Sequence, residues 1–446
     1  MAHWATIALE SWGRDRARVT AARPERLNEV VAALAQPTPR GILAHGAGRS
    51  YGDVALNDGG HQVLTGRLDR LLSFDSGSGV LVAECGVTFD LLRRIFLPRG
   101  FACPVIPGTG AVTLGGAAAN DIHGKNHDAV GSFGDHVVWI DVAVPGGGIA
   151  RCSREELPEL FDATIGGIGL TGLIVQMAIR MVRVPSSELM VRETRLPHID
   201  AFLSALVEAR TRSTYSVGWI DAMARGADLG RGILETAEWA PLPTPTRKPR
   251  GGVCVPFDLP GFALNSWLVK AFNQLYWQRV PPGGRERTMP AHRFFHPLDT
   301  VHRWNRLYGR RGFRQFQCVL PDASASQGLV SLLDATARAR MSSFLAVLKT
   351  LGAEGRGHLS FPIPGFTLAL DFPRRRGVDG LLAQLEKITR DHGGRVYLAK
   401  DATLSPAGFA DMYPRLGSFR HVLAEIDPKR RMGSNMARRL AIHEVP

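Results

Sequence analysis

Hydrophobic residues recur along this chain with two different periods, which divide it into short strands and helices. Leu27, Val30 and Leu34 share one face of a helix predicted over 24–35. The same spacing predicts further helices over 88–96, 154–161, 196–210, 259–279, 325–340, 380–392, 405–412, 415–426 and 434–442. Apolar runs bounded by turn residues predict strands over 41–44, 63–72, 80–85, 137–144, 148–152, 173–184, 313–320, 343–351, 366–372 and 395–400, with a strand and turn over 100–107. This mixture indicates an α+β fold.

Three glycine-rich segments interrupt the first part of the pattern. They are HGAGRSYGD at 45–53, PVIPGTGAVTLGGAAANDIHGKNHDAVGSFG at 104–134 and ATIGGIGLTG at 163–172. Glycine allows a positive φ and lets another group approach the backbone closely, and successive free N–H groups can bind an anion. The functional interpretation is a backbone cradle for a phosphorylated cofactor, with polar side chains at its reactive part. The alternative is a set of surface loops between strands.

The pattern changes after Pro185, and a length of 446 residues suggests two domains. Residues 241–253 and 280–287 are rich in Pro, Gly and Arg, which predicts two loops. The remaining strands and helices between 187 and 394 predict a second domain, a sheet backed by helices.

Composition narrows the class of protein. Lys and Arg outnumber Asp and Glu by 54 to 41, a net charge of +13, which favours anionic partners such as nucleic acid, a membrane surface or phosphorylated ligands. The five cysteines are scattered without metal-ligand spacing, so reduced thiols, no metal site and a cytoplasmic protein are expected. The sequence predicts neither a secretory signal nor a membrane-spanning helix.

The order of the three glycine clusters resembles the FAD-binding proteins of the vanillyl-alcohol-oxidase type. Further patterns (HGKNH, GSFG, HPLD, SFPIPG, YLAKD and MARRL) are similar to members of this family that oxidise a lipid-linked pentose, and the resemblance runs from about residue 40 to 440. The G-x-G-x-x-G fingerprint of a Rossmann unit, which needs a βαβ context, does not describe these clusters.

The resemblance implies a discontinuous FAD domain, residues 1–186 and 395–446, with a substrate domain at 187–394 inserted between them. It implies that FAD is held without a covalent bond, because members with covalently bound FAD carry a histidine where Arg49 follows Gly48. The cofactor-binding residues that it implies are Ala44, His45, Gly46, Ala47, Gly48, Arg49, Ser50, Tyr51, Gly52, Asp53, Val54, Gly108, Thr113, Leu114, Gly115, Gly116, His123, Gly124, Lys125, Asn126, Ile174 and Tyr397.

The implied reaction is hydride transfer from a carbon bearing a hydroxyl to flavin N5. It needs one group that accepts the hydroxyl proton and a positive group near the developing oxygen anion. Lys400 in YLAKD matches the active-site lysine of the family, and Tyr51 and His123 match further active-site positions. Their alternatives are a solvated surface charge for Lys400 and local loop hydrogen bonds for the other two.

Substrate contacts are predicted for a second set of residues: Lys125, Trp219, Gln315, Gln317, Lys349 and Lys400. Gln315 and Gln317 lie two apart on a predicted strand and therefore face one way, which suits either hydroxyl recognition or a plain polar sheet face. Lys349 could hold a phosphate, and Trp219 could be a sugar or prenyl wall or core. Ala369 stands where the relatives carry a cysteine, which removes a thiol but no atom that hydride transfer requires.

The resemblance implies oxidation of a sugar secondary hydroxyl, at C2′ of a polyprenyl-phosphate ribose, with a separate NAD(P)H-dependent reductase completing an epimerisation to the arabinose. Oxidation of a soluble alditol or aldonolactone is the alternative within the class. A basic nucleic-acid-binding protein is the alternative outside it, although the charge is diffuse and no nucleic-acid motif is present. Since a lipid-linked substrate lies in a membrane, residues 247–293, with basic loops around aromatic residues, are predicted to dock on the inner membrane.

Overall fold

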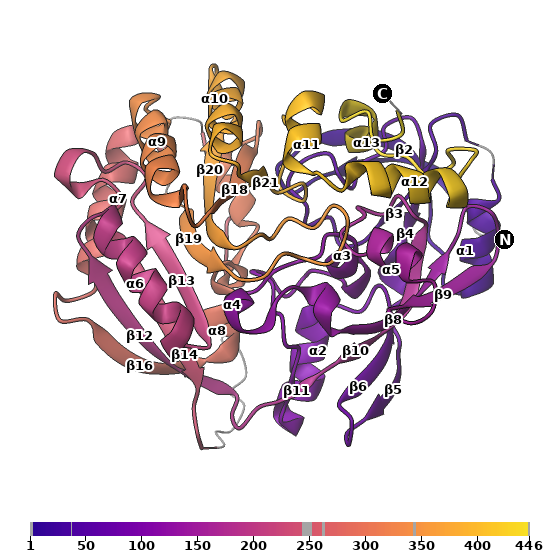
Figure 1. The fold of residues 1–446 in the computed structure, drawn as a ribbon, viewed down its shortest axis with the longest axis horizontal. Helices are drawn as coiled ribbons and strands as arrows, with labels where there is room; N and C mark the ends of the chain where they lie inside the picture. Colours follow the sequence, from indigo (N-terminus) through magenta and orange to yellow (C-terminus); the bar gives the residue numbers. More distant parts are fainter. Residues whose placement is uncertain (1–2, 37, 243–251, 261–263, 342–344, 445–446) are drawn as a thin grey trace.

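The chain folds into two bodies that lie side by side. The computed structural model describes residues 3–36, 38–242, 252–260, 264–341 and 345–444. The first part of the chain and its C-terminal part together form the body on the right of Figure 1, and the middle of the chain forms the body on the left. Both termini therefore lie on the same body.

The right-hand body contains two sheets. One has the order β1-β2-β4-β3 and the other the order β5-β6-β10-β8-β9. Their strands are β1 (Trp4–Glu10), β2 (Arg16–Ala22), β3 (Ile42–His45), β4 (His61–Leu64), β5 (Leu71–Asp75), β6 (Val80–Glu84), β8 (Val137–Ala143), β9 (Ile149–Ser153) and β10 (Leu173–Arg180). A short ladder joins β7 (Phe101–Ala102) to β11 (Val182–Arg183).

Helices from both ends of the chain surround these sheets. They are α1 (Leu27–Leu34), α2 (Phe89–Phe96), α3 (Leu114–Ala119), α4 (His127–Val130), α5 (Pro158–Thr164), α11 (Pro406–Met412), α12 (Leu416–Ile426) and α13 (Asn435–Arg439). The C-terminal segment returns to β3, where the Ile42 N–H donates to Arg431 O and the Gly433 N–H donates to Ile42 O. Residues 431–433 are thus hydrogen-bonded to β3, the strand that leads into the first glycine-rich segment.

The left-hand body is built on one eight-stranded sheet of order β16-β12-β14-β13-β19-β20-β18-β21. Its strands are β12 (Glu188–Leu196), β13 (Tyr215–Ile220), β14 (Gly232–Trp239), β16 (Arg285–Pro290), β18 (Phe313–Pro321), β19 (Ala346–Leu351), β20 (Gly365–Pro373) and β21 (Arg395–Val396). A separate two-stranded ladder pairs β15 (Val253–Cys254) with β17 (Val301–His302).

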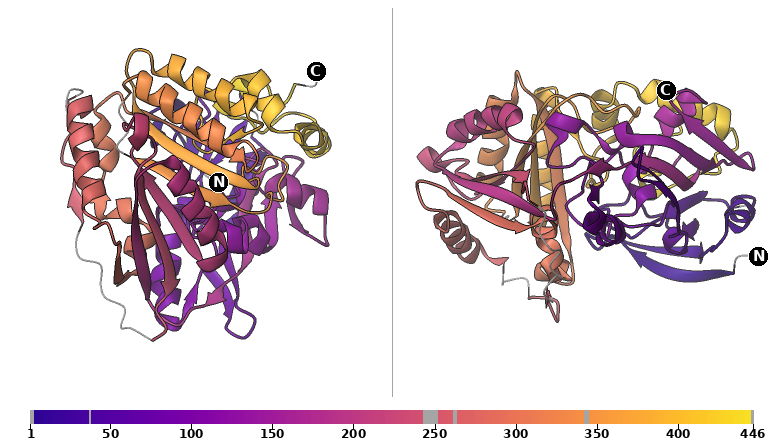
Figure 2. Two further views of the ribbon diagram at one scale, coloured as in Figure 1. Left: turned by 60° about the vertical axis from the view of Figure 1, so that its left-hand side comes forward. Right: turned by 90° about the horizontal axis from the view of Figure 1, so that it is seen from below.

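The two faces of this sheet differ in what covers them. Helices α6 (Ile199–Arg212), α9 (Ala325–Arg338) and α10 (Val378–Asp391) lie along one face (Figure 2), and α8 (Ala291–Phe295) follows β16. Beneath these helices, alternate strand residues such as Leu348, Leu368 and Leu370 are fully buried. The residues between them point to the opposite face, toward the right-hand body and α7 (Ser266–Gln278).

Several predicted elements differ from the structure. The predicted strand over 63–72 divides into β4, a 3₁₀ turn at Thr65–Arg67 and β5, and the predicted helix over 154–161 begins at Pro158, after Leu157 adopts a φ of 48°. The predicted loop over 280–287 ends in β16, because Arg285 and its successors pair with β12. The predicted strand over 395–400 is limited to Arg395–Val396, and the antiparallel hairpin β1–β2 was missed.

Strands β12, β13 and β14 were not predicted, and the boundaries of other elements differ from the prediction. The predicted helix over 259–279 starts at Ser266, where the Asn265 side chain accepts from the N–H groups of Trp267 and Leu268. The predicted loop over 241–253 falls largely on 243–251, outside the described residues. The division into 1–186, 187–394 and 395–446 stays a prediction, and β21, at the start of the third segment, pairs with β18 of the eight-stranded sheet.

An arginine clamp holds three of the sequence motifs together. Arg439, in MARRL, donates to both carboxylate oxygens of Asp53 at 2.8 and 2.9 Å and to Asp401 at 2.8 Å. Asp53 belongs to the first glycine cluster and Asp401 to YLAKD, so distant segments meet at one guanidinium. Because a bidentate guanidinium–carboxylate pair is specific in geometry, the clamp fixes how these segments lie.

We expect Arg439→Leu to lower the free energy of unfolding by about 3–5 kcal/mol, because it leaves two carboxylates enclosed without their cation. Urea unfolding followed by circular dichroism measures this. The matched control is Arg438→Leu at the exposed neighbouring position, for which little change is expected. Equal stability of the two variants would contradict the clamp.

Candidate functional site

The three glycine clusters meet around α3. A Cβ added at Gly46 would lie 2.6 Å from Thr113 Oγ1, and Thr113 caps α3 by accepting from the Gly116 N–H at 3.2 Å. At the other end of α3, the Gly166 N–H donates to Ala118 O and the Ile168 N–H to Ala119 O, at 2.8 and 2.7 Å. The first and second clusters therefore touch where α3 begins, and the third touches where it ends.

The first cluster also contacts the C-terminal motif YLAKD. The Tyr51 N–H donates to Ala399 O at 3.1 Å, and a Cβ at Gly52 would lie 1.7 Å from Asp401 O. Any other residue at position 52 would have to displace this backbone. The close approach places Lys400 Nζ 3.6 Å from the centre of the Tyr51 ring. Two of the predicted catalytic side chains are thus in contact.

The polar side of the eight-stranded sheet carries most of the predicted substrate residues, and we call it the site face. Antiparallel pairing sets Gln317 opposite Ala369 and Ala369 opposite Val347, with Gln315 opposite Asp371 and Lys349 opposite Thr367. Directly paired residues of antiparallel strands project to the same side. The site face comprises Trp219, Gln315, Gln317, Val347, Lys349, Thr367, Ala369 and Asp371. The predicted common orientation of the two glutamines is confirmed.

His123 joins the second glycine cluster to the site face. Its Nε2 lies 3.1 Å from Gln317 Nε2 and its Nδ1 lies 3.0 Å from Lys349 Nζ. Burial, followed by the nearby Lys349, lowers the pKa of His123 well below its ordinary value, so the ring is neutral. A neutral imidazole has one acceptor nitrogen, so only one of the two contacts, with the Gln317 amide or with the Lys349 amine, has the ring as acceptor, and the tautomer decides which one.

Three lysines, Lys125, Lys349 and Lys400, lie around this region and are largely buried. Burial lowers the pKa of Lys400 to about 7, although Asp371 opposes the shift. Burial and the charges of the other two lysines lower the pKa of Lys349 to about 7, and burial lowers that of Lys125 to about 8. Lys125 Nζ also lies 4.0 Å from the centre of the Phe294 ring. An anion placed among these amines would raise all three pKa values.

A buried carboxylate that the sequence did not single out completes the cluster. Asp371 is fully buried, accepts a hydrogen bond from the Gln315 amide and lies 3.4 Å from the Tyr308 hydroxyl. Burial raises the pKa of Asp371 to about 7, while Gln315 and Lys400 act to lower it. Burial, with Asp371 next, raises the pKa of Tyr51 well above its ordinary value. Asp371 and Lys400, which both have a pKa of about 7, therefore act on each other here.

Sequence reasoning could have found Asp371 in part. It lies two residues after Ala369, so the alternation of the predicted strand puts both on one side. What the sequence did not provide is the pairing that sets this strand beside Gln315. Asp299, in HPLD, was likewise missed as a contact: its carboxylate accepts from the Gly110 N–H at 2.8 Å.

Much of the polar segment 120–127 supports the loop rather than the site face. Asn126 donates to Pro104 O at 2.9 Å, and His127 accepts from the Gly352 N–H at the same distance. The Asp121 carboxylate accepts from the Gly134 N–H at 2.9 Å and from the Ser360 hydroxyl at 2.5 Å. These bonds fold GSFG back on the rest of the second glycine cluster, tie SFPIPG to that cluster and orient His123 and Lys125.

The other predicted residues lie on nearby elements. Residues 44–54 form the end of β3 and the loop that follows it, Ile174 lies buried on β10, and Tyr397 follows β21. The Tyr397 ring lies 5.6 Å from that of His123, and its hydroxyl donates to Asn120 O at 3.2 Å. Trp219 is at the far end of the site face, where its ring lies 4.7 Å from Tyr276 of α7.

The residues present fit FAD. Within the described parts of the chain, the amide N–H groups of residues 47–50 and 108–109 have no acceptor, and Gly108 faces open space. The side-chain oxygens of Asn120 and Asn126 are buried without a partner among the described residues. Free main-chain donors on glycine-rich turns suit the two phosphates, and the unpaired amide oxygens suit the polar edge of a flavin ring.

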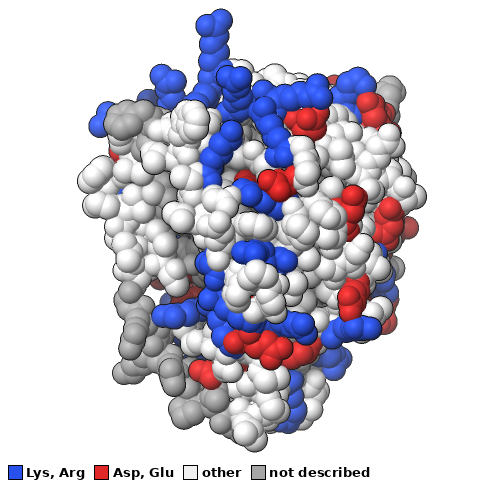
Figure 3. All heavy atoms as spheres, turned by 90° about the vertical axis from the view of Figure 1, so that its left-hand side faces the viewer, with Lys and Arg blue, Asp and Glu red and all other residues white. Residues whose placement is uncertain are grey.

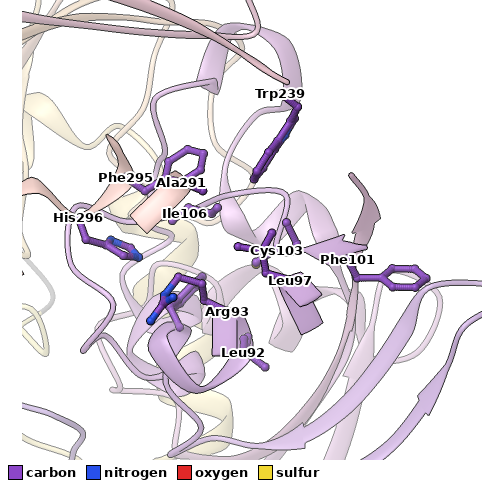
Figure 4. A pocket seen from close by; sticks show the side chains of 12 residues that line it. Leu92, Arg93, Leu97, Phe101, Cys103, Ile106, Trp239, Ala291, Phe295 and His296 are labelled. Atoms are coloured by element: carbon purple, nitrogen blue, oxygen red, sulfur yellow. The ribbon is translucent and has the colours of Figure 1, made fainter. Parts of the chain in front are cut away.

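A small apolar cavity lies beside the site but is too small for a sugar. Its volume is about 30 Å³, which is room for roughly one water molecule. Figure 4 shows Trp239 and Phe295 on one side of it and Leu92 and Arg93 of α2 on the other. It therefore fills a packing gap between the two bodies. Among the described residues, no group of three or more His, Cys, Asp or Glu could hold a metal ion.

Within the stretch predicted to dock on a membrane, several of the basic and aromatic residues make contacts inside the protein. Arg279, Arg285 and Arg287 all contact the fully buried Glu193, so these bases are engaged within the protein. Tyr276 and Trp277 point inward, the latter donating to Leu196 O at 3.1 Å. Arg247, Lys248 and Arg250 lie outside the described residues. No helix in the described ranges is long and apolar enough to span a bilayer.

Sequence comparisons with known proteins also indicate an FAD-binding oxidase. Residues 17–153 match the family described as "FAD binding domain", and residues 373–440 match the family described as "D-arabinono-1,4-lactone oxidase". The chain is 34% identical to decaprenylphosphoryl-beta-D-ribose oxidase of Mycolicibacterium smegmatis, over 98% of each chain. It is also 27% identical to L-gulonolactone oxidase of Bos taurus over 36% of each chain, and 27% identical to cytokinin dehydrogenase 2 of Oryza sativa subsp. japonica over 55% of this chain and 46% of that one.

We expect the flavin to be released completely by acid precipitation, because Arg49 occupies the position from which a histidine would form the ring bond. Its guanidinium donates to Ala47 O at 2.7 Å and lies 4.7 Å from the Trp12 ring. Absorbance of the supernatant and in-gel fluorescence of the denatured protein measure the result. Yellow colour retained in the pellet would contradict it.

Proposed function

The chain belongs to the family of vanillyl-alcohol-oxidase-type FAD oxidoreductases that includes decaprenylphosphoryl-beta-D-ribose oxidase, and from this premise we propose that it oxidises C2′ of a polyprenyl-phosphate ribose. The secondary hydroxyl becomes a ketone, which is the first half of an epimerisation to the arabinose. The expected α+β fold and the FAD cofactor are confirmed by the family matches. The substrate and the roles of individual residues are proposals.

The observation that carries the proposal is the set of enclosed lysines beside hydroxyl-binding amides. Lys125, Lys349 and Lys400 surround a surface on which Gln315 and Gln317 present polar groups. Enclosed amines with lowered pKa values are costly without an anionic partner. A sugar that carries a phosphate provides both the anion and the hydroxyls, whereas a neutral sugar provides only the hydroxyls.

The oxidation removes a hydride from the carbon and a proton from its oxygen. Bound FAD supplies the acceptor for the hydride. We assign the proton to Asp371, whose pKa of about 7 suits a general base at neutral pH. Lys400, held over the Tyr51 ring, is assigned to stabilise the negative charge that develops on the oxygen. Tyr51, whose ring contacts Lys400 Nζ, is assigned to hold that amine in place.

The remaining residues are assigned to binding. Lys349 and Lys125 hold the substrate phosphate, and neutral His123 fixes the amine of Lys349 and the amide of Gln317. Gln315 and Gln317 recognise the sugar hydroxyls. Trp219, at the far end of the site face, forms a wall for the sugar or for the start of the prenyl chain. Ala369, between Gln317 and Val347, leaves more room there than a cysteine would.

The proposal has two consequences for partners. The ketone must be reduced from the other side of the ring, which requires a separate NAD(P)H-dependent reductase. A polyprenyl chain remains in a bilayer, so the protein must reach its substrate as a peripheral protein at the inner membrane.

A second candidate function is oxidation of a soluble alditol or aldonolactone. The match of residues 373–440 to the "D-arabinono-1,4-lactone oxidase" family favours it. That segment contains Tyr397, Lys400 and Arg439, which serve the cofactor side and the clamp in either function. The lysines at 125 and 349 lie outside the segment and distinguish the two substrates.

Anaerobic mixing with a panel of sugars tests the proposal. A short-chain polyprenyl-phosphate ribose should bleach the flavin absorbance, and the product should be two hydrogens lighter by mass spectrometry. The same lipid-linked ribose without its phosphate should react at least about tenfold more slowly, since each lost charge contact costs about 1.5–3 kcal/mol. Faster bleaching by an alditol or an aldonolactone would favour the second candidate.

The rate of flavin reduction should depend on pH as a bell whose maximum lies near pH 7. The active form needs Asp371 deprotonated and Lys400 protonated, and both have a pKa of about 7. Below the maximum Asp371 is protonated, and above it Lys400 is neutral, so the rate falls on both sides. The two apparent pKa values belong to the coupled pair. Stopped-flow absorbance at subsaturating substrate, where the rate reports the pKa values of the free enzyme, measures the profile.

Two variants assign the limbs of the bell. Asp371→Asn should lower the rate about 10²-fold and remove the acidic limb, with partial recovery in Asp371→Glu. Lys400→Ala should lower the rate about 10²-fold or more and remove the basic limb while FAD stays bound. An unchanged acidic limb in Asp371→Asn would show that another group accepts the proton.

A further inference from the structure

Helix α7 has two opposite faces, and its inner face is well satisfied. The Asn273 amide donates to the buried Asp221 carboxylate at 2.6 Å, and Val269 is buried. Tyr276 lies against Trp219 at the far end of the site face. The helix therefore needs no further partner on the side that faces the sheet.

The outer face of α7 is apolar and open to solvent. Trp267 is 84% exposed, Leu275 69% and Leu268 56%. These residues recur at the spacing of one helical stripe. A surface helix normally places its polar residues outward, and a contiguous apolar stripe of this kind marks an interaction site.

Cations lie beside the N-terminal half of this stripe. Lys270 is exposed on α7 itself, and exposed Arg340 lies at its N-terminal end, where Ser266 Oγ donates to Arg340 O at 3.4 Å. Arg375 reaches the same end by donating to Leu264 O at 2.7 Å. On the face shown in Figure 3, a broad region without charges adjoins a group of Lys and Arg side chains. An apolar stripe bordered by bases is the composition of an interfacial membrane element.

We propose that the outer face of α7 docks on a bilayer with anionic headgroups and brings the lipid-linked substrate to the site. Trp267, Leu268 and Leu275 enter the headgroup boundary while Lys270 and Arg340 meet lipid phosphates. The proposal rests on the proposed function, since the helix that touches the bilayer also contacts Trp219 of the site face. The bases that contact lipid in this proposal lie at the N-terminal end of α7. They are not the predicted arginines around Glu193, because those form ion pairs within the protein.

A second copy of the chain is the competing occupant of the stripe. A two-fold dimer over α7 would bring Lys270 and Arg340 close to their own copies, and like charges brought together oppose association. An anionic bilayer has the opposite sign and attracts the same bases. The charge around the stripe therefore favours lipid.

Flotation of the FAD-loaded protein with phosphatidylcholine vesicles, with and without phosphatidylglycerol, tests the proposal at low salt. Wild type should float with the anionic vesicles. Trp267→Ser with Leu275→Ser should lower the bound fraction at least about tenfold. Lys270→Gln with Arg340→Asn should lower it about fivefold or more and weaken its dependence on salt. The matched control, Val207→Ser with Leu72→Ser, removes exposed apolar residues elsewhere and should bind as wild type does.

Failure of wild type to float, or equal flotation of the α7 variant and the control, would overturn the docking proposal. A dimer in sedimentation that dissociates in the Trp267→Ser and Leu275→Ser variant would overturn it in favour of a second copy. The flavin-bleaching rate with a short-chain, water-dispersed substrate should be the same in all variants. Absence of bleaching by every lipid-linked sugar, with normal flotation, would instead reject the proposed function alone.

Discussion

The dehydration of three amines is the physical constraint on which the proposed site depends. Lys125, Lys349 and Lys400 are held so closely among protein atoms that their pKa values fall to about 8, 7 and 7. In the folded protein the charged forms of these amines are therefore destabilised by burial, and a bound anion would stabilise them. Asp371 offsets part of it for Lys400, and neutral His123 adds no further positive charge. The arrangement is selective because a neutral ligand leaves the amines as they are.

Glycine residues and a small number of ion pairs allow the segments that carry the site residues to pack closely together. Gly52 lets the Tyr51 backbone lie directly against residues 399–401, and Gly46 lets the first cluster touch Thr113. Arg439 then fixes Asp53 to Asp401. Asp121 bonds to Ser360 and thereby ties the second cluster to the segment that leads into β20. The side chains to which we assign catalytic roles are thus positioned by backbone contacts between segments far apart in the sequence.

The sequence predicted the family and the cofactor more completely than it predicted the contacts between individual residues. The order of glycine clusters and short motifs identified the FAD-binding family, and strand alternation set Gln315 and Gln317 on one side. Register between strands was not accessible, because it depends on packing of the whole sheet, and so Asp371 was missed as a partner of Gln315. The β1–β2 hairpin and β16 were also missed, since strands exposed on one side carry a weak apolar pattern. Charge composition marked 279–287 as basic but did not show that buried Glu193 engages its arginines.

The most direct test of the account is whether binding of a phosphorylated sugar takes up protons. Calorimetric titration with a phosphorylated pentose in two buffers of different ionisation enthalpy, near pH 8 and so about one unit above the pKa of Lys349 and Lys400, measures the proton balance. Because an anion raises the pKa of these amines, we predict net proton uptake on binding, and a smaller uptake in Lys349→Met. Binding without proton exchange, or with proton release, would contradict the account.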